Sequence, residues 1–371
     1  MPMYSIFRNW INRYFADEEA VLLVLIMIGA VIVLMTMGDI LAPMIASMII
    51  AFLMEGMVAR LRGWGVPHLV AVSLASIVFV GALAVIMLVL LPGLWQQLTR
   101  LMTDVPRMFG EWQSVVLLLP QKYPNIVSEP QIAQLMEAIA KRIGDFGQQV
   151  VSFSVTRLPI LAAVIVYLVL VPILVFFFLK DGRKVLRFVA SFLPNERPVM
   201  TKIGLEMNQQ IANYVRGKVI EILLVGSVSY VAFIFLGLNY ALLLAISVGL
   251  SVVIPYIGAA VVTLPIAMIA YMQWGWSSDF MTVIIVYGVI QALDGNVLVP
   301  LLFSETVNLH PIAIILAVLV FGGIWGFWGV FFAIPLATLI KAILNAWPTR
   351  HEELPGVVVG DANDDTESAA S

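Results

Sequence analysis

Leu238–Met272 reads LNYALLLAISVGLSVVIPYIGAAVVTLPIAMIAYM, and Leu309–Ile343 reads LHPIAIILAVLVFGGIWGFWGVFFAIPLATLIKAI. Both runs are apolar, and both are interrupted, the first by Pro and Gly at Pro255–Gly258 and the second by four Gly within Gly322–Gly329. Each interruption ends on a Gly that lies 20 residues into its run, so we interpret the two runs as an internal repeat. A broken helix frees backbone groups that hydrocarbon cannot satisfy. Paired breaks of this kind are typical of a transporter's substrate site.

The composition indicates an all-α polytopic membrane protein. Hydrophobic residues make up 61% of the 371 residues and charged residues 12%, where a soluble protein carries about 25% charged residues. The net charge of −3 depends on the tail at 348–371, which holds six acidic residues and one Arg. The chain has no Cys, which excludes disulfides, thiol catalysis and cysteine-ligated metal or iron–sulfur centres.

Continuous apolar runs predict six further membrane spans, because a span needs about 20 apolar residues. With the two broken runs they give about eight membrane segments. Asp39 separates the first two spans so closely that we expect a tight hairpin there. The predicted spans are Ala20–Met37, Ile40–Met54, Leu69–Leu91, Leu158–Leu179, Val219–Leu236 and Phe280–Leu302.

Positive charge predicts the orientation, because basic residues gather in cytoplasmic loops. Arg60 and Arg62 follow the second span, and eight basic residues lie between Lys180 and Lys218. Both loops are cytoplasmic if both termini are cytoplasmic. Residues 92–157 then form a small helical extracytoplasmic domain. Residues 181–218 read as two amphipathic helices split at Pro194, the first of them lying on the inner leaflet.

The predicted organisation has six parts. Residues 1–91 hold an N-terminal amphipathic helix and spans one to three, 92–157 the extracytoplasmic helical domain, and 158–180 the fourth span. Residues 181–218 are the cytoplasmic amphipathic helices, 219–347 the transport region with the repeat, and 348–371 an acidic disordered tail.

The two broken runs fit helical hairpins that enter and leave the membrane on the same side. About 32 residues of helix would be about 48 Å long, against a hydrocarbon core of about 30 Å. Two full crossings would need about 40 residues, more than either run contains. We therefore expect re-entrant hairpins, the first opening outward and the second inward. The alternative is one kinked crossing for each run.

Asp294 is the sharpest candidate for function, because it lies inside the apolar run Phe280–Leu302. A carboxylate at the bilayer centre costs about 2.5–3.5 kcal/mol and should face a cavity or a partner. It would couple transport to an ion or proton, or contact substrate; alternatively it caps a helix that restarts after an Asp-Gly-Asn break. Gln291 shares its helix face. Asn296 either contacts substrate or bonds the local backbone.

The interruptions themselves supply further candidates for a solute pathway. Pro255, Tyr256 and Gly258 shape the first break, where exposed amides would suit an anionic or polyhydroxylated solute; turn formation alone is the alternative. Trp325 and Trp328 lie at the second break and would stack on a solute or plug a path. As membrane-interface aromatics they would be ordinary.

Glu305 and His310 lie five residues apart between Phe280–Leu302 and the second broken run. Beside a pore they would relay protons; in a solvated loop they would be ordinary polar residues. With only three His in the chain and no ligand-spaced cluster, we expect no metal site.

Several signatures are absent from the sequence. It has no Gly-x-x-x-x-Gly-Lys-Ser/Thr loop for ATP, no His-Glu-x-x-His and no Gly-x-Ser-x-Gly. Nothing in it suggests nucleic-acid binding. We therefore expect no enzyme, no catalytic residues and no cofactor.

Six further motifs carry family information: Glu206–Ile211, Asn213–Lys218, Pro255–Ala259, Gln291–Pro300, Leu309–Ile312 and Phe321–Lys341. They resemble the PerM-type permeases of the autoinducer-2 exporter (AI-2E) family, and the resemblance covers about Phe15 to Trp347. It implies a bacterial inner-membrane secondary transporter, export of the furanone autoinducer-2 or sodium/proton antiport, and a homo-oligomer.

Three classes of function remain open at this stage. A secondary transporter would move a small molecule or an ion across the lipid bilayer by alternating access, with the two broken units moving against spans one to four. An ion channel could use the same architecture. A membrane scaffold for other envelope proteins, or an intramembrane enzyme, is the third class; an enzyme would need two facing titratable groups near the midplane.

Overall fold

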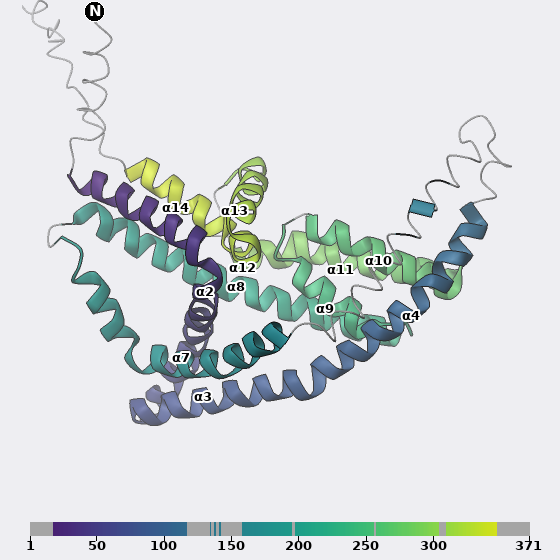
Figure 1. Cartoon of the computed structure of the whole chain (residues 1–371), viewed down its shortest axis with the longest axis horizontal. Coiled ribbons are helices and arrows are strands. Elements are labelled where there is room, and N and C mark those ends of the chain that lie inside the picture. Colours follow the sequence, from purple (N-terminus) through teal and green to yellow (C-terminus); the bar gives the residue numbers. More distant parts are fainter. Residues whose placement is uncertain are drawn as a thin grey trace, which may run out of the picture.

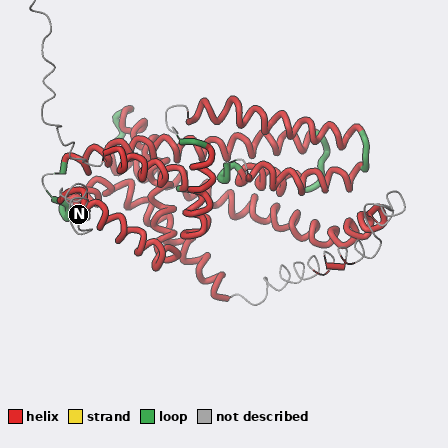
Figure 2. Tube along the Cα trace, turned by 90° about the horizontal axis from the view of Figure 1, so that it is seen from above, coloured by secondary structure: helices red, strands yellow, loops and turns green. Residues whose placement is uncertain are grey.

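The computed structural model describes residues 18–116, 134, 137–138, 141, 158–194, 197–255, 257–303 and 309–346. In this part of the chain every regular element is a helix and no strand is present (Figure 2). The predicted all-α class is therefore confirmed. The N-terminal amphipathic helix, the acidic tail and most of the predicted extracytoplasmic domain lie outside the described residues.

The helices follow one another in the order shown in Figure 1. Two of them are five-residue π-helical turns, labelled η. The elements are α2 (Glu18–Gly63), α3 (His68–Val85), η1 (Ile86–Leu90), α4 (Leu91–Val116), α7 (Leu158–Ala190), α8 (Pro198–Phe235), α9 (Ala241–Ser251), α10 (Ile257–Trp274), α11 (Ser278–Leu293), η2 (Asp294–Leu298), α12 (Val299–Phe303), α13 (Pro311–Phe331) and α14 (Ala333–Ala346).

Eight helical stretches among the described residues are long and apolar enough to cross a bilayer. Six of them overlap the spans expected from the continuous apolar runs, and two fall in the broken runs. The chain is thus a multi-pass membrane protein. The eight stretches are Val21–Gly38, Ile40–Gly63, His68–Arg107, Val164–Ala190, Pro198–Phe235, Ile257–Trp274, Ser278–Phe303 and Pro311–Phe331.

The expected hairpin at Asp39 is wrong, because α2 is one helix of 46 residues that runs through this position. A reversal between helices needs a connection of about 2–8 residues, and a single charged residue does not supply one. The helix bends instead near its middle (Figure 1). Pro43 lies inside it and removes one backbone donor, which is a usual cause of such a bend.

The helix at α3 continues through η1 into α4, so the predicted boundary at Pro92 is not marked by a break. Two polar side chains of α4 hold the start of α9. The Gln97 Oε1 atom accepts from the Leu243 amide at 2.9 Å, and Asp104 accepts from the Tyr240 hydroxyl. These two hydrogen bonds join α4 to the start of the first broken run.

The first broken run is interrupted as predicted. Helix α9 ends at Ser251 and α10 begins at Ile257, and the two helices pack against each other. Gly258 makes this contact possible: a Cβ atom there would lie 1.7 Å from the Ser251 carbonyl oxygen. Because only Gly lacks a Cβ, only Gly allows such a close approach.

The second broken run repeats this arrangement. Non-helical dihedral angles at Trp325 and Gly326 interrupt α13, and α14 packs back against α13. Gly329, the counterpart of Gly258 in the proposed repeat, lies under a backbone carbonyl as well. A Cβ atom on it would be 1.8 Å from the Phe321 oxygen. Gly258 and Gly329, which occupy equal positions in the two runs, thus each allow a backbone carbonyl to approach closely.

The two interruptions touch each other through their flanking residues. Val253 packs in one apolar cluster with Phe331, and Ile254 packs in another with Phe321 and Val330. Helix α8 supports the first unit from the other side, where Gly226 and Gly249 bring α8 and α9 into backbone contact. Small residues at a helix contact are how membrane helices approach closely.

Substituting Gly258→Ala should push α9 and α10 apart. Overpacking of this kind destabilises by about 1–3 kcal/mol, so we expect a lower thermal unfolding midpoint in detergent. Gly288→Ala in α11 is the matched control, because a Cβ there meets nothing within 4 Å. Equal midpoints for both variants would contradict the close contact.

Candidate functional site

A cavity of about 470 Å³ lies where the first interruption meets α8 and the π-helical turn η2. Five polar side chains line it, Tyr214, Lys218 and Glu221 from α8 and Gln291 and Asp294 from the end of α11 and η2. Most of the remaining wall is apolar, from the α9–α10 connection, α12, and the starts of α13 and α14. A mostly apolar pocket with a few convergent polar groups is typical of small-ligand sites.

Helix α8 presents its three polar residues on one face, because they are four and three residues apart. The Lys218 Nζ atom lies 2.6 Å from Glu221 Oε2 and 3.0 Å from the Val252 carbonyl oxygen. Lys218 is 4% exposed and Glu221 2% exposed. The ammonium also lies 5.2 Å from the centre of the Phe303 ring. The two side chains form a buried ion pair in the cavity wall.

Tyr214 lies one helical turn before Lys218 and, like it, donates a hydrogen bond to a backbone carbonyl oxygen. Its hydroxyl donates to the Phe331 carbonyl oxygen at 2.9 Å. Phe331 is the last residue of α13, and Val252 directly follows α9. The carbonyls at the ends of two interrupted helices therefore each receive a hydrogen bond from the same face of α8.

Asp294 begins η2, the widened turn between α11 and α12. The turn has no capping hydrogen bond from a side chain. The Asp294 Oδ1 atom and the Gln291 Nε2 atom are buried without a hydrogen-bond partner among the described residues. Asp294 also lies within Coulombic range of both Lys218 and Glu221.

The site holds two carboxylates and one ammonium, so it carries an excess negative charge when all three groups are ionised. An uncompensated charge in apolar surroundings is costly. A cation or a proton that joins Asp294 would remove this excess.

The structure brings together three of the predicted residues. Asp294, Gln291 and Pro255 line the cavity, and Gly258 is buried just behind it in the α9–α10 contact. Asn296 is exposed and its Nδ2 atom donates to the Ala292 carbonyl at 2.8 Å, the local backbone bond that was the alternative reading. Tyr256 and Glu305 lie outside the described residues.

The other three predicted residues do not line the cavity, although His310 lies between two lining residues, Leu309 and Pro311. His310 caps α13, its Nδ1 atom accepting from the Ile312 amide at 3.3 Å. Trp325 packs on α2, where its indole lies against Gly38, and it stacks on Phe332. Trp328 also stacks on Phe332 and meets the Phe331 ring edge-on.

The sequence interpretation missed Glu221 and assigned Lys218 to a cytoplasmic helix. One signal was present, because Glu221 lies inside the predicted span Val219–Leu236. An acidic residue within a span needs a partner. Lys218, three residues earlier on the same helix face, is such a partner.

A multi-pass helical protein with a polar cavity at paired helix breaks has the construction of a membrane transport protein. The chain belongs to the AI-2E family of transporters, since the family model described as "AI-2E family transporter" matches residues 21–349. It is 45% identical over 346 residues to the "Putative permease PerM" of Escherichia coli (strain K12), covering 93% of this chain and 98% of that protein.

More distant relatives carry similar descriptions. The "Putative transport protein YueF" of Bacillus subtilis (strain 168) is 26% identical over 305 residues, which are 81% of this chain and 82% of that protein. The "Putative transport protein YrrI" of the same organism is 25% identical over 303 residues, covering 81% and 85%. The family resemblance expected from the sequence motifs is thus confirmed.

Removing the Tyr214 hydroxyl should weaken the contact between α8 and the second broken run. Tyr214→Phe leaves the Phe331 carbonyl without its donor, and a buried unsatisfied group costs about 1–3 kcal/mol. We expect a lower unfolding midpoint in detergent. The control is Tyr230→Phe on the same helix, because Tyr230 is exposed. If both variants unfold at the wild-type midpoint, the hydrogen bond contributes nothing.

Proposed function

We propose that this protein is a bacterial inner-membrane secondary transporter whose substrate or coupling ion binds in the cavity beside Asp294. One observation supports this most: a carboxylate oxygen buried in an apolar span faces a cavity and has no hydrogen-bond partner among the described residues. Such a group is expensive within a membrane and is usually functional.

The cavity suits a small polar solute or an ion. Its volume of about 470 Å³ falls within the range of about 300–1,000 Å³ that is usual for small-ligand sites. Export of an autoinducer-2-like compound and sodium/proton exchange both fit. In either case, the two carboxylates outnumber the single ammonium in the cavity, and this negative charge supports coupling to a cation.

Alternating access would come from the two broken units, α9–α10 and α13–α14, moving against α2, α3 and α7. Helix α9 has 11 residues and is about 16 Å long, too short to cross a core of about 30 Å. This length supports the re-entrant hairpin for the first run, which we propose opens outward. The second would then open inward.

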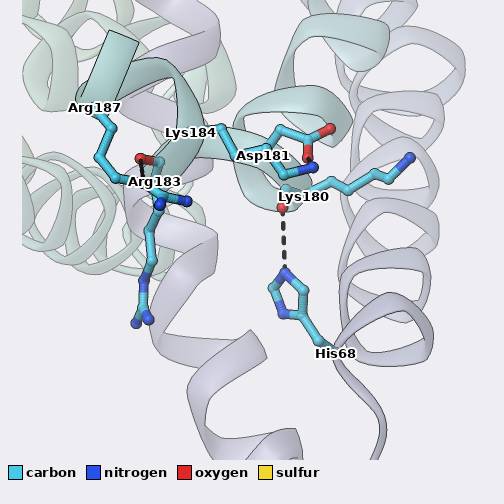
Figure 3. A network of polar contacts seen from close by, with 6 residues as sticks. All are labelled: His68, Lys180, Asp181, Arg183, Lys184 and Arg187. Carbon is cyan, nitrogen blue, oxygen red and sulfur yellow. Dashed lines mark hydrogen bonds and ion pairs between the residues drawn. The ribbon is translucent and has the colours of Figure 1, made fainter. Parts of the chain in front are cut away.

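Basic residues support a cytoplasmic position for the end of α7. Figure 3 shows Lys180, Arg183, Lys184 and Arg187 gathered there, with His68 of α3 held 3.3 Å from the Lys180 carbonyl oxygen. Arg60 and Arg62 end the neighbouring helix α2. We propose cytoplasmic termini, residues 92–157 on the opposite side of the membrane, and a homo-oligomeric assembly.

Asp294→Asn should abolish ion-coupled flux while leaving the folded protein intact, because the amide keeps the shape but cannot carry charge or exchange a proton. The test is flux in proteoliposomes under imposed proton and sodium gradients, with candidate solutes. Asp279→Asn is the control: the same change on α11, at its other end, where Asp279 is exposed.

Unchanged coupled flux in the Asp294→Asn protein would refute the role of this residue. Electrical recording distinguishes a channel, which passes far more ions per second than a carrier. Absence of any flux in the wild-type protein with every solute and gradient would favour a scaffold.

A further inference from the structure

Lys218 and Glu221 are the two charged side chains that are buried in the described part of the chain. The Lys218 ammonium connects three elements: α8, which carries it, the end of α9 through the Val252 carbonyl, and α12 through the Phe303 ring. The fit around it is tight, since a Cβ on neighbouring Gly217 would lie 2.8 Å from that ring.

The groups around the Lys218 ammonium favour a positive charge at this point. The end of a helix carries a partial negative charge from its unsatisfied carbonyls, which a positive group stabilises. Glu221 adds a full negative charge 2.6 Å from the Lys218 nitrogen. A carbonyl oxygen and a carboxylate oxygen at one point are also the ligands that small hard cations prefer.

Asp294 gives the ammonium, or any cation that replaces it, a second carboxylate in the same cavity. An ammonium has three N–H donors; that of Lys218 donates to the Val252 carbonyl oxygen and forms an ion pair with Glu221. The cavity therefore contains more negative charge than one lysine balances, beside a helix interruption that the same lysine fixes in place.

We propose that Lys218 is a tethered cation that closes the empty site: it holds the α9–α10 interruption against α8 until a small monovalent cation takes its place between Glu221 and the Val252 carbonyl. This inference rests on the proposed transport role of the cavity. Lys218 is a positioning residue, which acts on the transported cation by competing for the same oxygens.

The test reads the opening of the interruption directly. Because the chain has no Cys, Ala259→Cys provides a single reporter thiol in the cavity wall at the start of α10. The rate of its reaction with N-ethylmaleimide in native membranes measures how often the site opens. No substrate is needed.

The primary variant is Lys218→Met/Glu221→Gln in the Ala259→Cys background, since removing both partners leaves neither charge of this ion pair without the other. We expect labelling to become about tenfold faster or more, because a hydrogen bond to a charged group biases an opening equilibrium by at least about that factor. Lys218→Arg, which keeps the charge, should label at a rate close to that of the parent protein. Lys202→Met/Glu206→Gln makes the same two changes at exposed positions of the same helix and should have no effect.

Added cations then test whether the position accepts a free ion. In Lys218→Ala/Ala259→Cys, methylammonium should slow labelling towards the parent rate, whereas tetramethylammonium, which has no N–H donor, should not. Slowing by sodium instead would identify an inorganic cation as the competitor. Both results support the proposal and distinguish the two ligands.

Equal labelling of the double variant and the parent protein would overturn the closing role of Lys218. No protection by methylammonium or sodium would overturn the cation position. Failure of the proposed transport function is a separate outcome: coupled flux that survives Asp294→Asn, together with faster labelling of the double variant, would leave Lys218 as a closing residue in a cavity that is not the transport path.

Discussion

Two backbone carbonyls at the ends of interrupted helices need hydrogen-bond donors that a hydrocarbon environment cannot provide. One face of α8 provides both, Lys218 to Val252 and Tyr214 to Phe331. The other features of the site follow from this requirement. A buried lysine needs an anion, which Glu221 supplies, and the pair needs space and polar neighbours, which the cavity at η2 supplies.

The same face of α8 connects the two broken units. The two interruptions are also in apolar contact, because Val253 and Ile254 of the first pack in clusters with residues of α13. A shift of one unit would therefore change the donors and the packing of the other. Rigid helices that meet at a few replaceable polar contacts are suited to switching between two arrangements. In the proposed alternating-access cycle, the hydrogen bonds from α8 are contacts that would break and reform.

Much of this could be predicted from the sequence, because Pro and Gly limit where an apolar helix can continue. Both interruptions, the equal positions of Gly258 and Gly329, and the presence of an acidic residue, Asp294, within an apolar run were visible in the residue pattern. The widened turn at η2 was not, since Asp-Gly-Asn is equally compatible with a helix break. The hairpin expected at Asp39 was wrong because one charged residue was given the role of a turn.

Other features depend on contacts between distant residues. The packing of Trp325 on Gly38 and the donation from Lys218 to Val252 join segments that no periodicity relates. Sequence reasoning placed Trp325 at a solute path and Lys218 in the cytoplasm for this reason. The sequence did contain one indication of the buried pair: Glu221 is an acidic residue in an apolar span, and Lys218 lies three residues before it on the same helix face.

If water reaches the polar cavity at the helix interruptions, a water-soluble thiol reagent should reach it too. Gly295 lines the cavity, and a Cβ there meets nothing within 4 Å, whereas Val289 on α11 is 52% exposed and does not line the cavity. Only a thiol that can ionise reacts with a maleimide, and hydrocarbon prevents ionisation. Gly295→Cys should react with a membrane-impermeant maleimide in vesicles of one orientation, and Val289→Cys should not react. A Gly295→Cys protein as inert as Val289→Cys in both orientations would contradict the account.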